Sequence, residues 1–430
     1  MMTFSRSLLL LVLPVALACG DDDVPAEDSG TADADAEPPD LSADVANDAQ
    51  EDSAPDAVPD APSDLGGPPW EGPRIPGIFL LGPDDYDVHA EKMGGAPALV
   101  HFFVDWFGAE QLAASNADPS TRVEPPPIDP DGLRFLDFIY PDAVVALSWA
   151  MPLPNFDVPG PAWPNVPTVR DLLTGRYDDY IRDFARSLAP IEKEIWLTMF
   201  GEFDNNVFYA FGPEGLSAAA DDPGVAPAQR VPTTDDLNRY YGDPELPDGP
   251  ERVRDAFIRV IDIFREEGAT NVKWFMYGSS GYLGGGEQDA LITPTLREGV
   301  WNVDAVYPGD EYIDFVGKSL HHGDLASLRE TFEPAYEAWT RVSSRPFFAP
   351  EFSILAGGGI ASRAEQIREE FGSYFPSFPR FAAFASVDPV PESSNDEFVF
   401  YPYGGADDEF PDEVAAWRET VVESDAWQTR

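Results

Sequence analysis

The chain has few residues of the kinds that bind metal ions or form cross-links. It contains one cysteine, Cys19, and four histidines among 430 residues. A single cysteine excludes an intrachain disulfide and any zinc site built on several thiolates. His321 and His322 are adjacent and could both bind a metal, but no third histidine lies near them in the sequence. We therefore predict no metal site and no cofactor.

Basic residues are also scarce. The chain has 27 Lys and Arg against 78 Asp and Glu, which gives a formal net charge of -51 at pH 7. Nucleic acids and anionic lipid surfaces are themselves negatively charged, so this charge argues against either as a binding partner. It is compatible with a neutral substrate and with an exported protein that its charge keeps soluble.

The apolar run near the N-terminus is too short to span a membrane. It follows Arg6 and covers about ten residues at 8–17, whereas the hydrocarbon core of a bilayer needs about 20. This pattern predicts a signal peptide at residues 1–18. The letters ALAC at 16–19 resemble a bacterial lipobox, which would make Cys19 the lipidated N-terminus of an exported protein anchored at the outer membrane or cell surface. Cleavage of an ordinary secretory signal nearby is the alternative.

Residues 19–70 lack lysine and arginine and have no aromatic residue before Trp70. Asp, Ala, Pro, Ser and Glu dominate the segment, and such a composition buries too little apolar surface to offset the entropy of ordering. We predict a disordered acidic tether that holds the following domain away from the membrane. A calcium-binding array is the alternative, but the spacing of the acids matches no Ca²⁺ loop.

Residues 71–430 show no second segment of the tether type and are long enough for one large domain. Short apolar runs alternate there with amphipathic helical patterns, the clearest at 178–191, 250–268 and 325–342. Continuous apolar strands separated by helices predict a parallel sheet covered on both faces, and eight of them predict a (β/α)8 TIM barrel. The eight runs are 77–81, 98–106, 144–151, 194–203, 272–278, 315–320, 347–352 and 381–387.

Glutamates end two of the eight runs. Glu202 ends the fourth run and Glu351 the seventh, and strand ends four and seven face each other across the mouth of a closed eight-stranded barrel. Retaining glycoside hydrolysis requires two carboxyl groups roughly 5–5.5 Å apart, one as nucleophile and the other as acid and then base. The long connection 207–236 follows the fourth run and is expected at the same end of the barrel.

Other strand ends carry polar and aromatic side chains. Asp105 and Trp106 end the second run, Trp149 lies in the third, and His321 follows the sixth. The rings of Trp106 and Trp149, and of Phe208 after the fourth run, could stack on sugar rings, with packing in the core as the alternative for each. These residues are candidate substrate contacts.

Two segments carry a family resemblance most specifically: GATNVKW at 268–274 and YPGDEYIDFVG at 307–317, which APEF around Glu351 follows. They resemble glycoside hydrolase family 26, which contains β-mannanases and related endo-glycanases of the retaining (β/α)8 clan. The resemblance covers nearly all of 75–390 in order. It implies the same chemistry, with Glu202 as acid/base and Glu351 as nucleophile.

The sequence departs from the family around both glutamates. Gly201 stands where the family usually has histidine, Asp204 and Asn205 fall on its Asn-Gly pair, and Val207 or Phe208 falls on its tryptophan. His321 falls near the sixth-strand aromatic residue that holds the nucleophile. Phe384 is nearest to the tryptophan platform of the eighth strand. These departures indicate a divergent member with another substrate preference or with weakened activity.

The expected function is therefore that of a surface-tethered retaining glycoside hydrolase that cleaves a neutral β-linked polysaccharide such as a β-mannan. A non-catalytic barrel that binds glycans is the first alternative, which the altered surroundings of Glu202 favour. A barrel hydrolase that uses the same carboxylates on another bond is the second. Retention of both glutamates favours an enzyme over a binding protein.

Overall fold

A computed structural model describes the parts of the chain that form the barrel. Cys19, Asp204, Phe208 and the connection 207–236 lie outside the described residues, as do the signal peptide and nearly all of the tether, so those expectations stay predictions. In the described part, no helix combines the length and the apolar character needed to cross a membrane. The described residues are 67–79, 94–106, 125, 127–128, 133–134, 136–140, 142–150, 172–203, 250–278, 303–322, 324–354, 363–387 and 411–427.

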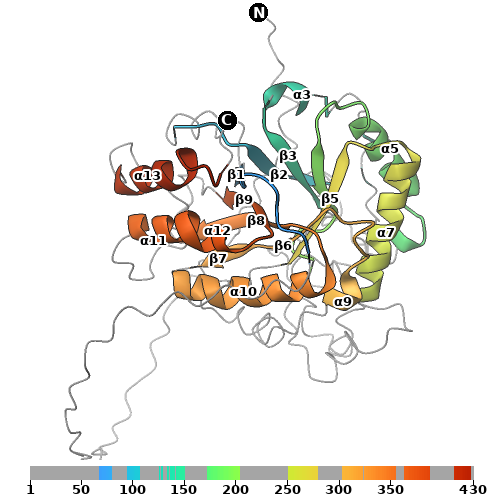
Figure 1. Ribbon diagram of the computed structural model, residues 1–430. Coiled ribbons are helices and arrows are strands. Elements are labelled where there is room, and N and C mark those ends of the chain that lie inside the picture. The colour runs from blue at the N-terminus through green and yellow to red at the C-terminus, as the bar shows by residue number, and fades with distance from the viewer. Residues whose placement is uncertain are drawn as a thin grey trace, which may run out of the picture. The chain divides into compact units, whose positions relative to one another are not determined.

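The strands form one closed parallel sheet, as predicted (Figure 1). Their order is β6-β5-β4-β3-β2-β1-β9-β8-β7, and a further pairing of β6 with β8 closes the ring. Ser319 interrupts the sixth strand of the barrel, so that β6 and β7 are two pieces of one strand. The strands are β1 (Ile75–Phe79), β2 (Leu99–Asp105), β3 (Val144–Ala150), β4 (Ile195–Thr198), β5 (Val272–Gly278), β6 (Phe315–Lys318), β7 (Leu320–His322), β8 (Phe347–Ile354) and β9 (Phe381–Val387).

Helices surround the strands (Figure 1). The three clearest helical patterns of the sequence are found as α5, α7 and α10, although α5 ends at Leu188, three residues before the predicted end. Asp324 begins α10 with a reciprocal cap, because its carboxylate accepts from the Ser327 N–H while the Ser327 hydroxyl oxygen accepts from the Asp324 N–H. The helices are α3 (Leu136–Ile139), α5 (Asp178–Leu188), α7 (Pro250–Glu266), α9 (Val303–Val306), α10 (Leu325–Val342), α11 (Arg363–Glu369), η6 (π-helical, Glu370–Tyr374), α12 (Phe375–Ser377), α13 (Pro411–Trp417) and η7 (π-helical, Arg418–Val422).

The core has two layers because side chains alternate across each strand. The larger layer lies between the strands and the helices. The smaller one fills the barrel, where Trp196, Phe315 and Phe348 pack with ring centroids 3.9 Å (Trp196 to Phe315) and 5.2 Å (Trp196 to Phe348) apart. Trp70 packs against this inner layer. The apolar filling leaves polar side chains inside the barrel toward the carboxyl ends of the strands.

Candidate active site

Glu202 lies in a tight turn at 201–203, which follows the end of β4 at Thr198 by two residues. Its φ angle is 44°, and among the described residues it is the sole residue other than glycine with a positive φ. A left-handed backbone of this kind costs on the order of 1–2 kcal/mol for an ordinary residue. The next residue, Phe203, anchors the turn to β5 by donating its N–H to the carbonyl of Tyr277 (3.2 Å). The turn therefore holds a buried carboxyl group at the end of the strand.

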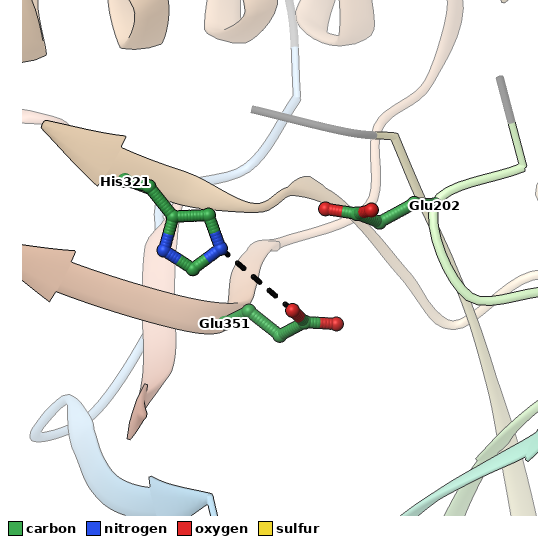
Figure 2. A group of neighbouring side chains, drawn as sticks. All are labelled: Glu202, His321 and Glu351. Carbon is green, nitrogen blue, oxygen red and sulfur yellow. Dashed lines mark ion pairs between the residues drawn. The ribbon is translucent and has the colours of Figure 1, made fainter. Parts of the chain in front are cut away.

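Glu351 lies in β8 and contacts polar groups through both carboxylate oxygens. The hydroxyl of Tyr277 on β5 donates to Oε1 at 2.8 Å. Nε2 of His321 on β7 lies 3.7 Å from Oε2, the pair that is dashed in Figure 2. The other ring nitrogen of His321 shares a hydrogen bond of 2.6 Å with the hydroxyl of Ser353, which fixes the plane of the imidazole.

The two glutamates and His321 converge on one space. Single ligand atoms of the three side chains all lie within 4.8 Å of one another, so a Glu202 oxygen and a Glu351 oxygen are no further apart than that. Figure 2 shows the carboxyl groups of Glu202 and Glu351 extending from opposite sides toward each other. The site thus has a pair of facing carboxyl groups with one imidazole beside them.

Burial and neighbouring groups have opposite effects on the pKa of Glu351. Burial alone raises this pKa, but the adjacent His321 imidazole and the Tyr277 hydrogen bond outweigh it, and the pKa lies below its usual value. The carboxyl group is therefore ionised at neutral pH. Burial, together with the negative charges of Glu351 and Glu202, raises the pKa of Tyr277 well above its ordinary value. Tyr277 consequently keeps its proton and acts as a hydrogen-bond donor.

Gly201 makes room for this donor. A Cβ atom at position 201 would lie 2.8 Å from the Tyr277 hydroxyl oxygen and 3.2 Å from the ring of Phe103. Any larger residue there would have to displace the hydroxyl that holds Glu351. The glycine at position 201 is thus linked to the position of Tyr277.

Two predicted sugar platforms, Trp106 and Trp149, are instead parts of the outer core. Both indoles are fully buried, with Trp149 stacked on Phe184 of α5 at 4.1 Å and Trp106 5.0 Å from the ring of Tyr180. The substrate-contact interpretation is wrong for both, because strand alternation turns them toward the helices rather than into the barrel. The alternative of core packing is correct.

Phe384 is also misassigned as a substrate contact. It lies on β9 with its ring fully buried against Phe352, Phe371 and Trp417, on the helix side of the sheet. The backbone of Asp105 belongs to β2, but its side chain lies outside the described part of the structure. Of the predicted site residues, the structure brings together Glu202, His321 and Glu351.

Sequence reasoning missed two polar residues of the site, Tyr277 and His101, because both lie inside apolar runs. Following every second residue of each strand, whose side chains share one face of the sheet, would have found them. Tyr277 shares the inward face of β5 with Phe275, and His101 shares that of β2 with Leu99. A polar residue in the inward phase of a buried strand needs a polar partner, and the mouth of the barrel supplies one.

Glu202, His321 and Glu351 are also the one group of described residues with the composition of a metal site. Ligand atoms on one zinc ion lie about 2.0–2.2 Å from it, so no two of them are more than about 4.4 Å apart. Ligand atoms of the three side chains lie within 4.8 Å of one another, so the group has nearly the spacing that a shared ion needs. The absence of a metal stays a prediction.

Comparisons with known proteins give distant similarities. No protein-family model matches the chain. Endoglucanase H of Acetivibrio thermocellus is 27% identical over 221 residues, which are 50% of this chain and 19% of that protein, so the match spans about a fifth of the relative.

Solved structures with a similar fold include a GH26 β-mannanase from Bacteroides ovatus (13% identity, TM-score 0.49, 83% of this chain and 90% of that one). They also include the GH26 domain of an endo-β-mannanase/endo-β-glucanase from Prevotella bryantii (14% identity, TM-score 0.47, 84% and 91%). Both of these solved structures are described as GH26 proteins.

Proposed function

We propose that the protein is a retaining glycoside hydrolase that cleaves a neutral β-linked polysaccharide. The observation that carries the proposal is the approach of Glu202 and Glu351 to within 4.8 Å between oxygen atoms at the mouth of a (β/α)8 barrel. Retaining enzymes place their carboxyl groups about 5–5.5 Å apart, whereas inverting enzymes leave about 6.5–9.5 Å for a water molecule. The geometry favours the retaining route.

The environment of Glu351 suits the role of nucleophile, and Glu202 faces it as the proposed acid and base. Glu351 is ionised and held by Tyr277, so its oxygen attacks the anomeric carbon and forms a glycosyl ester. Glu202 donates its proton to the departing glycosidic oxygen as that bond breaks. In the second step Glu202 takes a proton from water, the water oxygen bonds to the anomeric carbon, and the ester bond to Glu351 breaks. Both glutamates return to their first states.

The substrate class follows from charge and from the relatives. A chain of net charge -51 repels polyanions, so a neutral polysaccharide suits it better than an acidic one. The similar proteins are named as an endoglucanase and as β-mannanases. We expect activity on a β-mannan or a β-glucan, with β-mannan first because of the family 26 motifs.

A product assay tests this proposal. The full chain, freed from any membrane by detergent, is incubated with β-mannan, β-glucan and xylan, and new reducing ends are measured. NMR of the first product should show the same anomeric configuration as the substrate. An inverted product would contradict the retaining route, and binding of a glycan without cleavage would instead support the non-catalytic alternative.

Export and lipid anchoring are proposed on the sequence alone. The apolar run 8–17 followed by Cys19 supports a lipidated N-terminus that tethers the enzyme at the bacterial surface. Replacing Cys19 by Ser should release the protein from the membrane fraction of the cells that produce it. Retention of the Cys19→Ser chain in that fraction would contradict the anchor.

A further inference from the structure

Strand β8 changes its phase at the residue before Glu351. Phe347 and Ala349 face the helices, and so do Phe352 and Ile354, which leaves two residues rather than one between Ala349 and Phe352. The pairing with β9 shifts register at the same place. These are the marks of a β-bulge, in which one extra residue re-aims the side chains that follow. Strict alternation from Ala349 would turn Glu351 toward the helices, so the bulge brings it into the barrel.

The main-chain pairing of β8 is interrupted on both sides of the bulge. Toward β9, Ala349 pairs with Phe384 and the next recorded pair is Phe352 with Ser386. Toward the other neighbours, Phe348 pairs with Gly317 of β6 and pairing resumes at Phe352 with β7. The ladders therefore skip the segment that carries the candidate nucleophile. A buried carbonyl in such a segment needs another hydrogen-bond partner.

His101 supplies that partner from inside the barrel. Its Nδ1 lies 2.8 Å from the carbonyl oxygen of Pro350, and the side chain is fully buried. A carbonyl oxygen only accepts, so Nδ1 carries the proton. In the neutral ring Nε2 then accepts, and the hydroxyl of Ser148 donates to it at 2.8 Å. Burial lowers the pKa of His101 to about 4, although the charge of Glu351 and the bond to Pro350 oppose this. The neutral ring is therefore the form at neutral pH.

We propose that His101 is a positioning residue that locks the bulge of β8 and thereby fixes the direction in which Glu351 enters the active site. The bond to Pro350 replaces the main-chain pair that the bulge omits. The role rests on the proposed function of Glu351 as nucleophile. In this role His101 does not contact the sugar. Its imidazole is enclosed by four aromatic rings, those of Phe79, Phe103, Phe275 and Phe348.

A second contact connects His101 to the other support of Glu351. The Ser148 oxygen lies 3.3 Å from the hydroxyl of Tyr277, which donates to the Glu351 carboxylate. Among the described residues, the titratable groups that face His101 are thus Glu351 of β8 and, through Ser148, Tyr277 of β5. Strands β1 and β2 contribute aromatic rings to its surroundings. His101 is connected to the backbone beside Glu351 and to the donor at its side chain.

Three variants of the full chain test this role by kinetics. His101→Leu keeps much of the volume but cannot donate to Pro350, and a misplaced nucleophile should lower kcat about 10- to 100-fold with little change in KM. His101→Gln offers an amide donor and a carbonyl acceptor, so it should recover most of that loss. Phe79→Leu is the matched control, since it disturbs the packing against His101 without removing a hydrogen bond. Its kcat should stay near that of the unaltered chain.

Two kinetic outcomes would overturn the role. If His101→Leu turns over as fast as Phe79→Leu, the hydrogen bond to Pro350 does not position Glu351. If His101→Gln is as slow as His101→Leu, only the shape of the imidazole matters.

Nitrogen NMR of the labelled histidines tests the same geometry without an activity readout. His101 should be the neutral Nδ1–H tautomer at pH 6, and Glu351→Gln should lower its pKa further by removing a negative charge. A proton on Nε2, or a pKa that Glu351→Gln leaves unchanged, would overturn the proposal. If the NMR results are as expected while no glycan is cleaved, the proposed hydrolase activity fails and the connection between His101 and Glu351 stands.

Discussion

His321 and His322 are neighbours in the sequence, and each faces a glutamate on opposite sides of the sheet. The inner pair, His321 with Glu351, is separated by 3.7 Å and its side chains are 7% and 14% exposed. The outer pair, His322 with Glu370, is separated by 3.0 Å and both side chains are fully buried. The same two residue types therefore stand in an open arrangement at the barrel mouth and in a closed one under α11.

The difference lies in what else each carboxylate contacts. Gln366 donates to the same oxygen of Glu370 that His322 contacts, at 2.6 Å, and this cluster connects β7 to the helix layer. Glu351 instead has a short bond to Tyr277 on one oxygen, while the other faces His321 at a distance too long for a good hydrogen bond. The closed pair is suited to hold the fold, and the open pair can exchange its contacts for those of a substrate.

The largest expected difference between the pairs is in activity. Glu351→Gln keeps the shape of the side chain but removes the proposed nucleophile, and we expect kcat to fall by about 10⁴-fold or more. Glu370→Gln, the matched change in the outer pair, should leave kcat within about threefold because Glu370 lies outside the barrel. Steady-state kinetics on the best polysaccharide substrate measures both. Equal losses in the two variants would remove the functional distinction between the pairs.

The next difference is in stability. Glu370→Leu leaves buried donors on His322 and Gln366 without their acceptor, so the free energy of unfolding should fall by about 3 kcal/mol. Replacing His322 by Leu in the same chain removes one of those donors and should recover part of the loss. Urea unfolding of the two single variants and the double variant gives the coupling. A double variant whose loss is the sum of the single losses would show that His322 and Glu370 do not act as a pair.

The inner pair should also be visible in the pH profile. His321 helps to hold the pKa of Glu351 below its usual value, so the acid limb of kcat/KM should lie at low pH. In His321→Asn that pKa rises, and the acid limb should move to higher pH. The same pKa shift also affects stability. A carboxyl group whose pKa is lower in the folded than in the unfolded state stabilises the protein above its unfolded pKa. This stabilisation is lost as the pH falls through the folded pKa. His322→Asn should leave the acid limb in place, and an equal movement in both variants would contradict the assignment.

These pairs also show how far the sequence could predict the molecule. Eight apolar runs were enough for the barrel, since continuous buried strands between helices leave few other architectures. Glu202 and Glu351 could be found because each is an acid near the end of an apolar run, although β8 continues past Glu351 to Ile354. Trp149 and Phe384 were misassigned because the assignment used their position along the strand and ignored which face of the sheet each side chain points to. Alternation alone could not have placed Glu351 inside, because that depends on a bulge, and the one local signal for it is Pro350 inside the run, since proline cannot donate to the ladder.

The smallest expected effect concerns backbone conformation at two glutamates. Glu202 has a left-handed backbone, so Glu202→Gly should be more stable than Glu202→Ala by about 1 kcal/mol, since glycine adopts this conformation without strain. Glu370 begins a π-helical turn, and there the order should reverse, with Glu370→Gly less stable than Glu370→Ala by about 1 kcal/mol. Chemical denaturation of the four variants measures both differences. Because each comparison is between glycine and alanine at one position, loss of the carboxylate cancels, and the backbone term is left together with the contacts of one methyl group. A Glu202→Ala chain as stable as Glu202→Gly, or more stable, would show that the turn after β4 holds no strain, and that Glu202 is placed there without a cost in stability.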